Sequence, residues 1–374
     1  MSPTLVILLV GSCVAAACAL VGCFLVLREM ALLGDAISHA VLPGIVVAFL
    51  ITGERSPLPM VIGAGIVGVL TVFLVEISNR TRRLQEDASI GVVFPALFAL
   101  GVIMISRWAG QVDLDLDCVL YGEIAYAPWD TLMLGDRPIG PKALWVNGVI
   151  LAINLFFVLG FYKELKLTTF DPALAMTLGF APTALHYLLM TLVSVTVVCA
   201  FESVGAILVV AMLVVPPATA YLLTERLSRM LVVAVVSGVL SAVLGYLLAH
   251  RLDASIAGAI AVVAGVLFLL AFLASPRHGL IAKLARYRRV RIATAERLLL
   301  AHLHNGQGGL STGQIAQRFR WRPGFARRVI DRLSGREWIV DRDGLRLTST
   351  GEAVIEATGQ KELRHRPAPE LGPI

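Results

Sequence analysis

The chain has 374 residues, of which 57% are hydrophobic and only 16% charged, and its mean hydropathy is +0.81. Soluble globular domains carry about 25% charged residues, so this composition excludes a soluble globular protein. The formal net charge is +6, to which residues 276–374 contribute +10 and the first 275 residues −4, so the chain has two chemically different parts.

Apolar segments of spanning length, about 20 residues each, recur from the N-terminus to near residue 275. The first lacks a basic leading segment, so it is predicted to be an uncleaved helix and not a signal peptide. The joint between the sixth and seventh segments is very tight, which makes one of them a candidate for an irregular or re-entrant helix. The nine predicted spans are 4–27, 31–51, 57–76, 88–106, 144–162, 185–201, 203–223, 230–250 and 255–274.

The positions of Lys and Arg near the span ends predict the orientation of the bundle. The loop at 78–83 is basic, and the same side receives Lys163, Lys166, Arg226 and Arg229. Counting spans alternately from this side places the N-terminus outside and the C-terminus in the cytoplasm.

The second span contains Asp35 and His39, four residues apart, within an otherwise apolar run. Residues at this spacing share one face of a helix. A carboxylate in the middle of a membrane helix costs roughly 2.5–3.5 kcal/mol on insertion scales and usually faces a bundle interior or an ion path. Carboxylate and imidazole together suit Mn, Fe or Zn better than Mg or Ca. The alternative is structural: Asp35 caps the helix and His39 hydrogen-bonds a neighbouring helix.

The predicted outer loop at 107–143 is acidic. Negative charge at an entrance concentrates cations, although a plain solvated acidic loop has the same composition. An EF-hand is excluded, because Cys118 stands where that loop needs Gly and Ile124 where it needs Glu. The alternation of apolar and acidic residues at 112–117 predicts a short, half-buried extended segment. The loop's acidic residues are Asp113, Asp115, Asp117, Glu123, Asp130 and Asp136.

The predicted cytoplasmic loop at 163–184 contains a short helix. Asp171 is a suitable N-cap and Pro172 suits the first helical position. The helix is expected to run through Leu178 and to end at Gly179. Such a helix can seat in a cleft of a partner protein, or it can be an ordinary loop helix.

After residue 275 the composition changes to a basic segment, 276–292, which is predicted to be a juxtamembrane linker held by anionic lipid. The pattern then predicts a small domain at 293–360 and a disordered, Pro-rich tail at 361–374. Thr294 is the expected N-cap of the first helix of this domain.

The predicted order within 293–360 is a helix, a helix-turn-helix and a hairpin wing. The second helix begins near Ser311, and the third is led by Arg322 and Pro323. The hairpin turn lies at 341–344, where the turn chemistry is Asp-Arg-Asp-Gly. This order is typical of a winged helix domain of the α+β class.

Five sequence blocks, in order and spacing, resemble the permease subunits of the manganese, zinc and iron ABC importers. The resemblance covers residues 4–275. The blocks are REMALLGDAISHAVLPG at 28–44; EDASIG at 86–91 with ALGV at 99–102; VLYGEI at 119–124, with Tyr and Glu where the family has Phe and Asp; TFDPALA at 169–175 with LGF at 178–180; and FESVGAILVV at 201–210 with MLVVPPATA at 212–220.

The resemblance implies a type II importer, an all-α polytopic fold of about nine transmembrane helices in the bacterial plasma (inner) membrane. It implies a second permease subunit, identical or different, a cytoplasmic ABC ATPase and an extracytoplasmic metal-binding protein. No permanently bound cofactor is expected, and the cargo is a divalent Mn, Zn or Fe ion, with manganese favoured. The sequence has no G-x-x-x-x-G-K-[ST] phosphate loop, so the chain is not expected to be an enzyme.

The family's metal-path residues correspond to Asp35 and His39. Glu202 is a further candidate, either lining an outer gate or standing in a water-exposed turn. The segment that couples to the ATPase is assigned to Phe170, Asp171, Pro172, Ala175 and Gly179.

The C-terminal domain resembles the DNA-binding domain of the diphtheria-toxin-repressor-like metalloregulators, without their dimerisation and metal-sensing domain. Its candidate DNA contacts are Arg322, Arg327, Arg328 and Arg332. Winged helices also bind proteins, so DNA and protein contact both remain open. A second function hypothesis is a membrane-tethered, metal-responsive DNA-binding regulator without transport activity. The Asp35–His39 pair and the coupling segment favour transport, because a membrane anchor needs neither.

Overall fold

The chain forms two compact units, residues 1–280 and 281–374. Several predicted features lie outside the described residues. They are the centre of the acidic loop, residues 81–83 of the basic loop, residues 119–123 of the third block and the tail at 361–374. The computed structural model describes residues 2–53, 57–80, 86–108, 124–134, 137–275, 279–306, 310–341 and 344–355.

Within the described residues, nine helical segments are long and apolar enough to cross a membrane, which confirms the predicted number. The second of them is divided into two helices, α2 and α3. The segments are α1 (Pro3–Leu27), α2 (Ala31–Ala40) with α3 (Leu42–Thr52), α4 (Pro57–Arg80), α5 (Glu86–Trp108), α7 (Lys142–Gly160), α10 (Pro182–Val204), α11 (Ala206–Leu223), α12 (Leu227–Leu252) and α13 (Ile256–Ala274).

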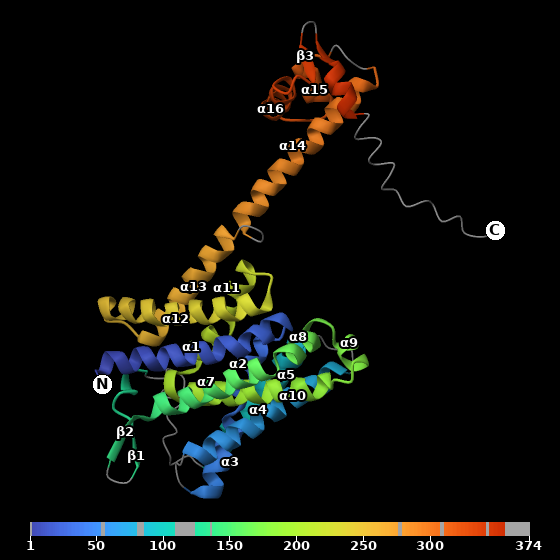
Figure 1. Ribbon diagram of the computed structural model, residues 1–374. Coiled ribbons are helices and arrows are strands. Elements are labelled where there is room, and N and C mark those ends of the chain that lie inside the picture. The colour runs from blue at the N-terminus through green and yellow to red at the C-terminus, as the bar shows by residue number, and fades with distance from the viewer. Residues whose placement is uncertain are drawn as a thin grey trace, which may run out of the picture. The chain divides into compact units, whose positions relative to one another are not determined.

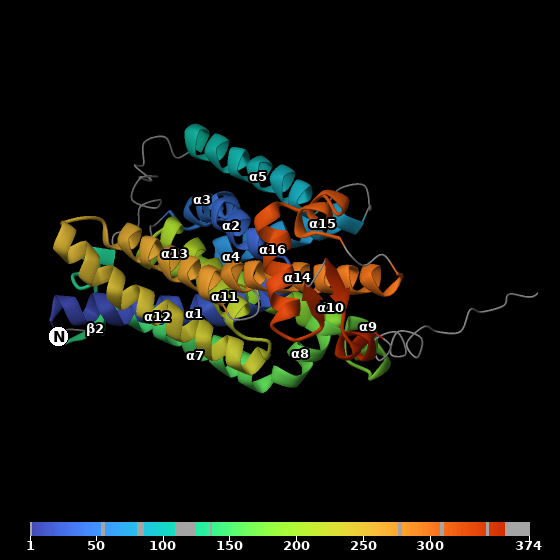
Figure 2. The same cartoon turned by 90° about the horizontal axis from the view of Figure 1, so that it is seen from above.

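Helix α1 lies at the centre of this unit, between α12 and α7 (Figure 1). It is the most buried of the spans and also packs against α10 and α11. A side chain at Gly22 would collide with the Leu213 carbonyl, so α1 and α11 pack backbone to backbone at this point. Figure 2 shows α5 at the edge of the bundle, next to α2 and α3.

Helices α10 and α11 are both regular over their full lengths, and the tight joint between them is the single residue Gly205, with φ 82° and ψ 163°. A positive φ suits glycine because it has no Cβ. Pro216 and Pro217 lie inside α11 without ending it, as membrane helices tolerate when neighbouring groups satisfy the freed carbonyls.

The connections contain one element that the sequence pattern did not predict. A hairpin of β1 (Thr131–Leu134) and β2 (Arg137–Pro141) follows a single turn of 3-10 helix, η1 (Ile124–Tyr126). The segment 131–141 had been assigned wholly to an acidic loop. The extended segment expected at 112–117 lies outside the described residues. On the opposite side, α8 (Tyr162–Phe170) and α9 (Pro172–Thr177) connect α7 to α10.

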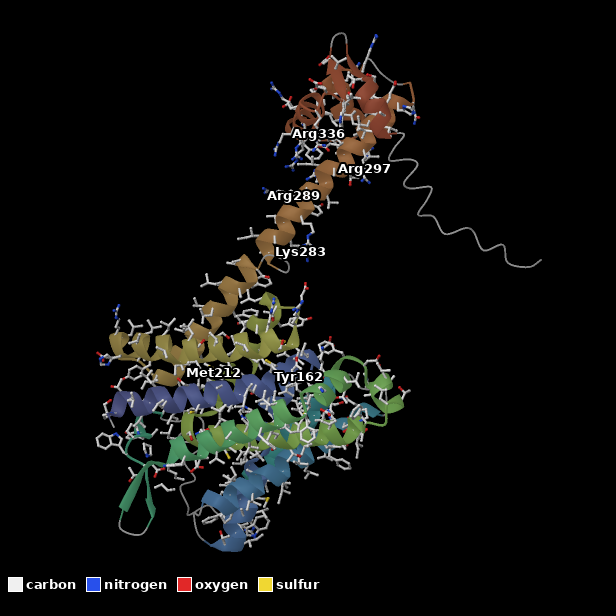
Figure 3. The ribbon with its side chains drawn as sticks, viewed as in Figure 1. Tyr162, Met212, Lys283, Arg289, Arg297 and Arg336 are labelled. Atoms are coloured by element: carbon white, nitrogen blue, oxygen red, sulfur yellow. The ribbon has the colours of Figure 1, made fainter. Side chains whose placement is uncertain are left out.

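The C-terminal unit begins on one long helix, α14 (Leu280–His304). The expected helix start at Thr294 was wrong, because Thr294 lies inside α14, and residues 280–292 of the basic segment belong to the same helix. Basic side chains, including Lys283, Arg289 and Arg297, lie along this helix (Figure 3).

Beyond α14 come α15 (Thr312–Arg318), α16 (Pro323–Ser334), β3 (Ile339–Asp341) and β4 (Leu345–Leu347). Ser311 and Gln314 form a capping box at the start of α15. Strands β3 and β4 are antiparallel, and Leu310 forms a further antiparallel bridge to Leu345. The core of this unit consists of Ala295, Leu299, Leu300, Leu303, Ile315, Val329, Ile330, Leu333, Ile339 and Leu345.

Candidate metal path and coupling segment

The structure places Asp35 and His39 one turn apart on α2, with 3.6 Å between Asp35 Oδ1 and His39 Nε2. Leu33 and Ile37, on the opposite face of α2, are fully buried and fix its rotation. The Asp35 and His39 side chains remain 46% and 31% exposed, respectively. The pair therefore lines an accessible face of the single subunit.

Helix α2 ends directly after His39. Pro43 lies at the start of α3 and, having no N–H, cannot donate the helical hydrogen bond to the His39 carbonyl. Instead, the N–H groups of Gly44 and Ile45 donate to Val41. A side chain at Gly44 would collide with the Gly63 carbonyl, so the redirected helix α3 packs closely on α4. Membrane transporters commonly bind their substrates at such discontinuous helices.

The surroundings of the pair are aromatic on one side. The His39 ring lies 5.9 Å from Phe94 and 6.3 Å from Phe98, both on α5, between ring centroids. Across the described residues, no group of three or more His, Cys, Asp or Glu side chains could hold a metal ion. The pair alone gives a divalent ion two ligands, so any further ligands must be water, backbone or groups from outside this set.

Glu202 lies near the end of α10, where its carboxylate accepts a hydrogen bond from Lys142 Nζ at 2.7 Å. Lys142 also lies 4.0 Å from the Asp130 carboxylate. These side chains line a cavity of about 120 Å³ that also includes Tyr126 and Ser203. The structure therefore places Glu202 in an ion-pair cluster and not with Asp35 and His39.

The short helix predicted in this loop is present as α9. Asp171 Oδ1 accepts a hydrogen bond from the Leu174 N–H at 2.9 Å, and Pro172 occupies the first turn, which confirms the predicted cap. Gly179 has a φ of 85°, and the Phe180 N–H returns to the Ala175 carbonyl. The segment therefore ends where the sequence indicated.

Ala175 differs from the other residues of this segment because it is fully buried. Its side chain packs inside the subunit, so it can stabilise α9 but cannot contact a partner protein directly. The exposed apolar side chains of the segment are Phe170, Leu174, Met176, Leu178 and Phe180. This face is the one available to a partner, and the sequence assignment of Ala175 had missed the rotation of the helix.

In the C-terminal unit, the four candidate arginines have different environments. Arg332 lies 3.8 Å from the buried carboxylate of Glu296, which also pairs with Arg336 at 3.3 Å. Arg328 Nε donates to the Gly324 carbonyl. Arg322, the N-cap residue of α16, and Arg327 are exposed. Arg332 therefore forms an ion pair within the unit, which its place in the sequence did not reveal.

Sequence reasoning also missed a polar cluster at the α8 end of the bundle. Arg28, Thr168 and His186 lie beside one another and line a cavity of about 330 Å³ with Glu76. In the sequence, Arg28 is marked only as the first residue of the block at 28–44. Its partners are more than 100 positions away in the sequence, which no local pattern signals.

A family model described as "ABC 3 transport family" matches residues 3–275. The manganese transport system membrane protein MntD of Bacillus subtilis is 49% identical over 280 residues, 75% of this chain and 95% of that protein. The zinc transport system membrane protein TroD of Treponema pallidum is 40% identical over 362 residues, 95% of this chain and 98% of that protein. Among solved structures, PsaBC from Streptococcus pneumoniae in complex with Fab matches with a TM-score of 0.63 and 31% identity, covering 78% of this chain and 96% of that one.

Proposed function

Because the chain belongs to the ABC 3 transport family, we propose that it imports manganese as the membrane-spanning subunit of an ATP-driven transporter. The chain is a permease of a manganese, zinc or iron importer in the plasma membrane. The Asp35–His39 pair on the divided second span supports the metal path, and the 49% identity to MntD supports manganese as the cargo.

The chain is not itself an enzyme. It works with a separate ATPase subunit and a substrate-binding protein, as a permease of this family does. The exposed apolar face of the coupling segment is suited to the ATPase, because a partner cleft would bury side chains that the chain leaves in water. A second permease copy would face the accessible side of the Asp35–His39 pair and supply the ligands that one copy lacks.

The chemistry of the pair suits transient binding. A carboxylate and an imidazole replace part of the water shell of a divalent ion, and two ligands from one subunit hold it weakly enough for release. Manganese favours oxygen-rich sites, whereas zinc gains more from imidazole and thiolate. A carboxylate, an imidazole and additional oxygen ligands would therefore accept manganese.

Glu202 contributes to the proposal only indirectly. Its ion pair with Lys142 would hold the outer end of α10 against α7, as part of a gate. The basic span ends support a cytoplasmic position for the α8–α9 side and for the C-terminus.

Metal selectivity tests the proposed cargo. We expect the complete complex, with its ATPase and binding protein in proteoliposomes, to accumulate radioactive manganese in the presence of ATP. Excess unlabelled manganese should suppress that uptake more than equal zinc or iron. Uptake of zinc in preference to manganese would make zinc the cargo. If none of the three metals is taken up in an ATP-dependent manner, the proposal is overturned.

For the C-terminal unit we propose a winged helix that contacts DNA. The support is its element order and the single antiparallel bridge from Leu310 to Leu345 beside the two-stranded hairpin. Arg322, Arg327 and Arg328 are exposed on or beside α16, whereas Arg332 is engaged by Glu296. The match to TroD extends over nearly the whole chain, so this unit accompanies a transporter there too.

A competition measurement tests this second proposal. At physiological salt, the full-length protein should prefer its own operon's promoter to random DNA by roughly a thousandfold, as specific binders do. Binding at low salt alone would not distinguish a specific DNA-binding domain from any basic surface, because counterion release drives nonspecific binding to DNA. No preference, together with binding to the ATPase, would make the unit a protein-interaction module instead.

A further inference from the structure

Arg28 caps the C-terminal end of α1, and its guanidinium reaches the last turn of α8. Nε and Nη2 donate to Thr169 Oγ1, each at 3.3 Å, and Nη2 also donates to Thr168 Oγ1 at 3.4 Å. Nη1 lies 3.1 Å from His186 Nδ1 on α10. A guanidinium has only donors, so the imidazole nitrogen accepts. One side chain thus joins three helices.

The partners are arranged to receive these bonds. The Thr168 hydroxyl donates its own hydrogen to the Glu164 carbonyl at 2.9 Å, which leaves its oxygen lone pairs for Arg28. These contacts of Arg28 are with neutral groups, and burial lowers the pKa of its guanidinium. Glu76 of α4 lies on the same cavity and supplies negative charge near His186. Burying part of a cation costs free energy unless its donors are paired, and the bonds to Thr168, Thr169 and His186 pair the donors of Arg28.

The chain on either side of these contacts leads to the two working parts of the transporter. Thr169 is two residues before Asp171, the cap of α9. After Arg28, a tight turn with Glu29 at φ 62° leads directly into α2. Asp35 lies four residues into that helix, or about 6 Å along its axis.

Helix α2 is tightly packed along one face. Leu33 and Ile37 are fully buried, and a side chain at Gly34 would collide with Leu213 of α11. Packed elements of this kind shift between discrete arrangements and do not deform continuously. A displacement at the Arg28 end of α2 would therefore reach the metal pair.

We propose that Arg28 is a positioning residue that ties the coupling segment to the helix of the metal pair, so that ATPase-driven movement of α8 and α9 shifts Asp35 and His39. This inference rests on the proposed function. The three guanidinium nitrogens together hold Thr168, Thr169 and His186 at once. A lysine ammonium is a single point and cannot reproduce this fork.

The test compares Arg28→Lys, Thr169→Val and their combination in the complete complex, reconstituted in proteoliposomes. Allosteric coupling free energies correspond to roughly 5–150-fold effects. We expect Arg28→Lys to lower manganese uptake per ATP hydrolysed by about tenfold or more, with the ATP hydrolysis rate itself largely retained. Thr169→Val should lower the ratio in the same direction. The double variant should be no worse than Arg28→Lys, because both changes remove one connection.

The control is Arg229→Lys, which changes an exposed arginine of α12 and should leave the ratio unchanged. A merely structural Arg28 would lower uptake and hydrolysis together with the amount of assembled complex. That result, or an unchanged ratio, would overturn the proposal. If the Arg28→Lys variant does not assemble with its ATPase, the Thr169→Val variant decides the question alone. Valine has the size of threonine but lacks the hydroxyl that accepts from Arg28. A wild-type complex without metal uptake would instead refute the proposed function.

Discussion

Replacing either Asp35 or His39 by alanine is expected to abolish metal uptake. Each change would remove one of the two metal ligands proposed on α2, and a divalent ion that has lost water would need both. Changes to groups that only support a metal ligand cost roughly 10–100-fold, so loss of a ligand should cost at least as much. The measurement is manganese uptake by the reconstituted complex, with assembly checked by co-purification of the ATPase.

Matched controls come from the same residue types elsewhere in the chain. His250 at the end of α12 and Asp331 on α16 are both exposed, and their alanine variants should transport normally. Normal uptake by both the Asp35→Ala and the His39→Ala variants would leave a structural polar pair and end the assignment of a metal path.

The second large effect concerns the coupling segment. Introducing glutamate at Leu174 or Met176 should release the ATPase from the membrane or uncouple hydrolysis from transport. Both side chains are exposed and apolar. A carboxylate buried there by the partner would lose its hydration without gaining a partner of opposite charge, which costs binding free energy. Central interface residues contribute about 2 kcal/mol or more, which is roughly thirtyfold in affinity. The measurement is the amount of ATPase that sediments with the membranes.

The cap of α9 gives a milder variant of the same test. Asp171→Ala removes the acceptor for the Leu174 N–H and should cost the helix about 1 kcal/mol, whereas Asp171→Asn keeps an acceptor and should restore coupling. A cysteine at Met176 should crosslink to the ATPase, and one at the buried Ala175 should not. Labelling of Met176→Cys from outside the cell would show that α9 lies outside, and the predicted topology would then be wrong.

The sequence predicted those parts of the fold that depend on local pattern. The nine spans follow from hydropathy, and the cap at Asp171 follows from Asp-Pro at a helix start. The placement of Asp35 beside His39 follows from helical spacing alone. None of these needs knowledge of what packs against the helix.

Other features depend on contacts between distant segments. Ala175 and Leu174 are neighbours and both are good helix formers, and only tertiary packing decides that Ala175 is buried and Leu174 exposed. The Arg28 cluster joins α1 to α8 and α10 across more than 100 residues of sequence. The continuity of α14 through Thr294 was missed because a good N-cap residue is also tolerated in a helix interior when its neighbours favour the helix.

The break between α2 and α3 has an electrostatic consequence for the ion. Every helix carries partial negative charge at its C-terminal end, equivalent to about half an elementary charge. Helix α2 ends at Ala40, so the carbonyls of its last turn, including that of His39, which Pro43 cannot engage, place this charge beside the imidazole. An unbroken span would carry the same charge to its outer end, more than ten residues away. The positive end of α3, which begins at Leu42, offsets much of this charge, so the local contribution to a cation would come from the His39 carbonyl oxygen, to which Pro43 cannot donate a hydrogen bond.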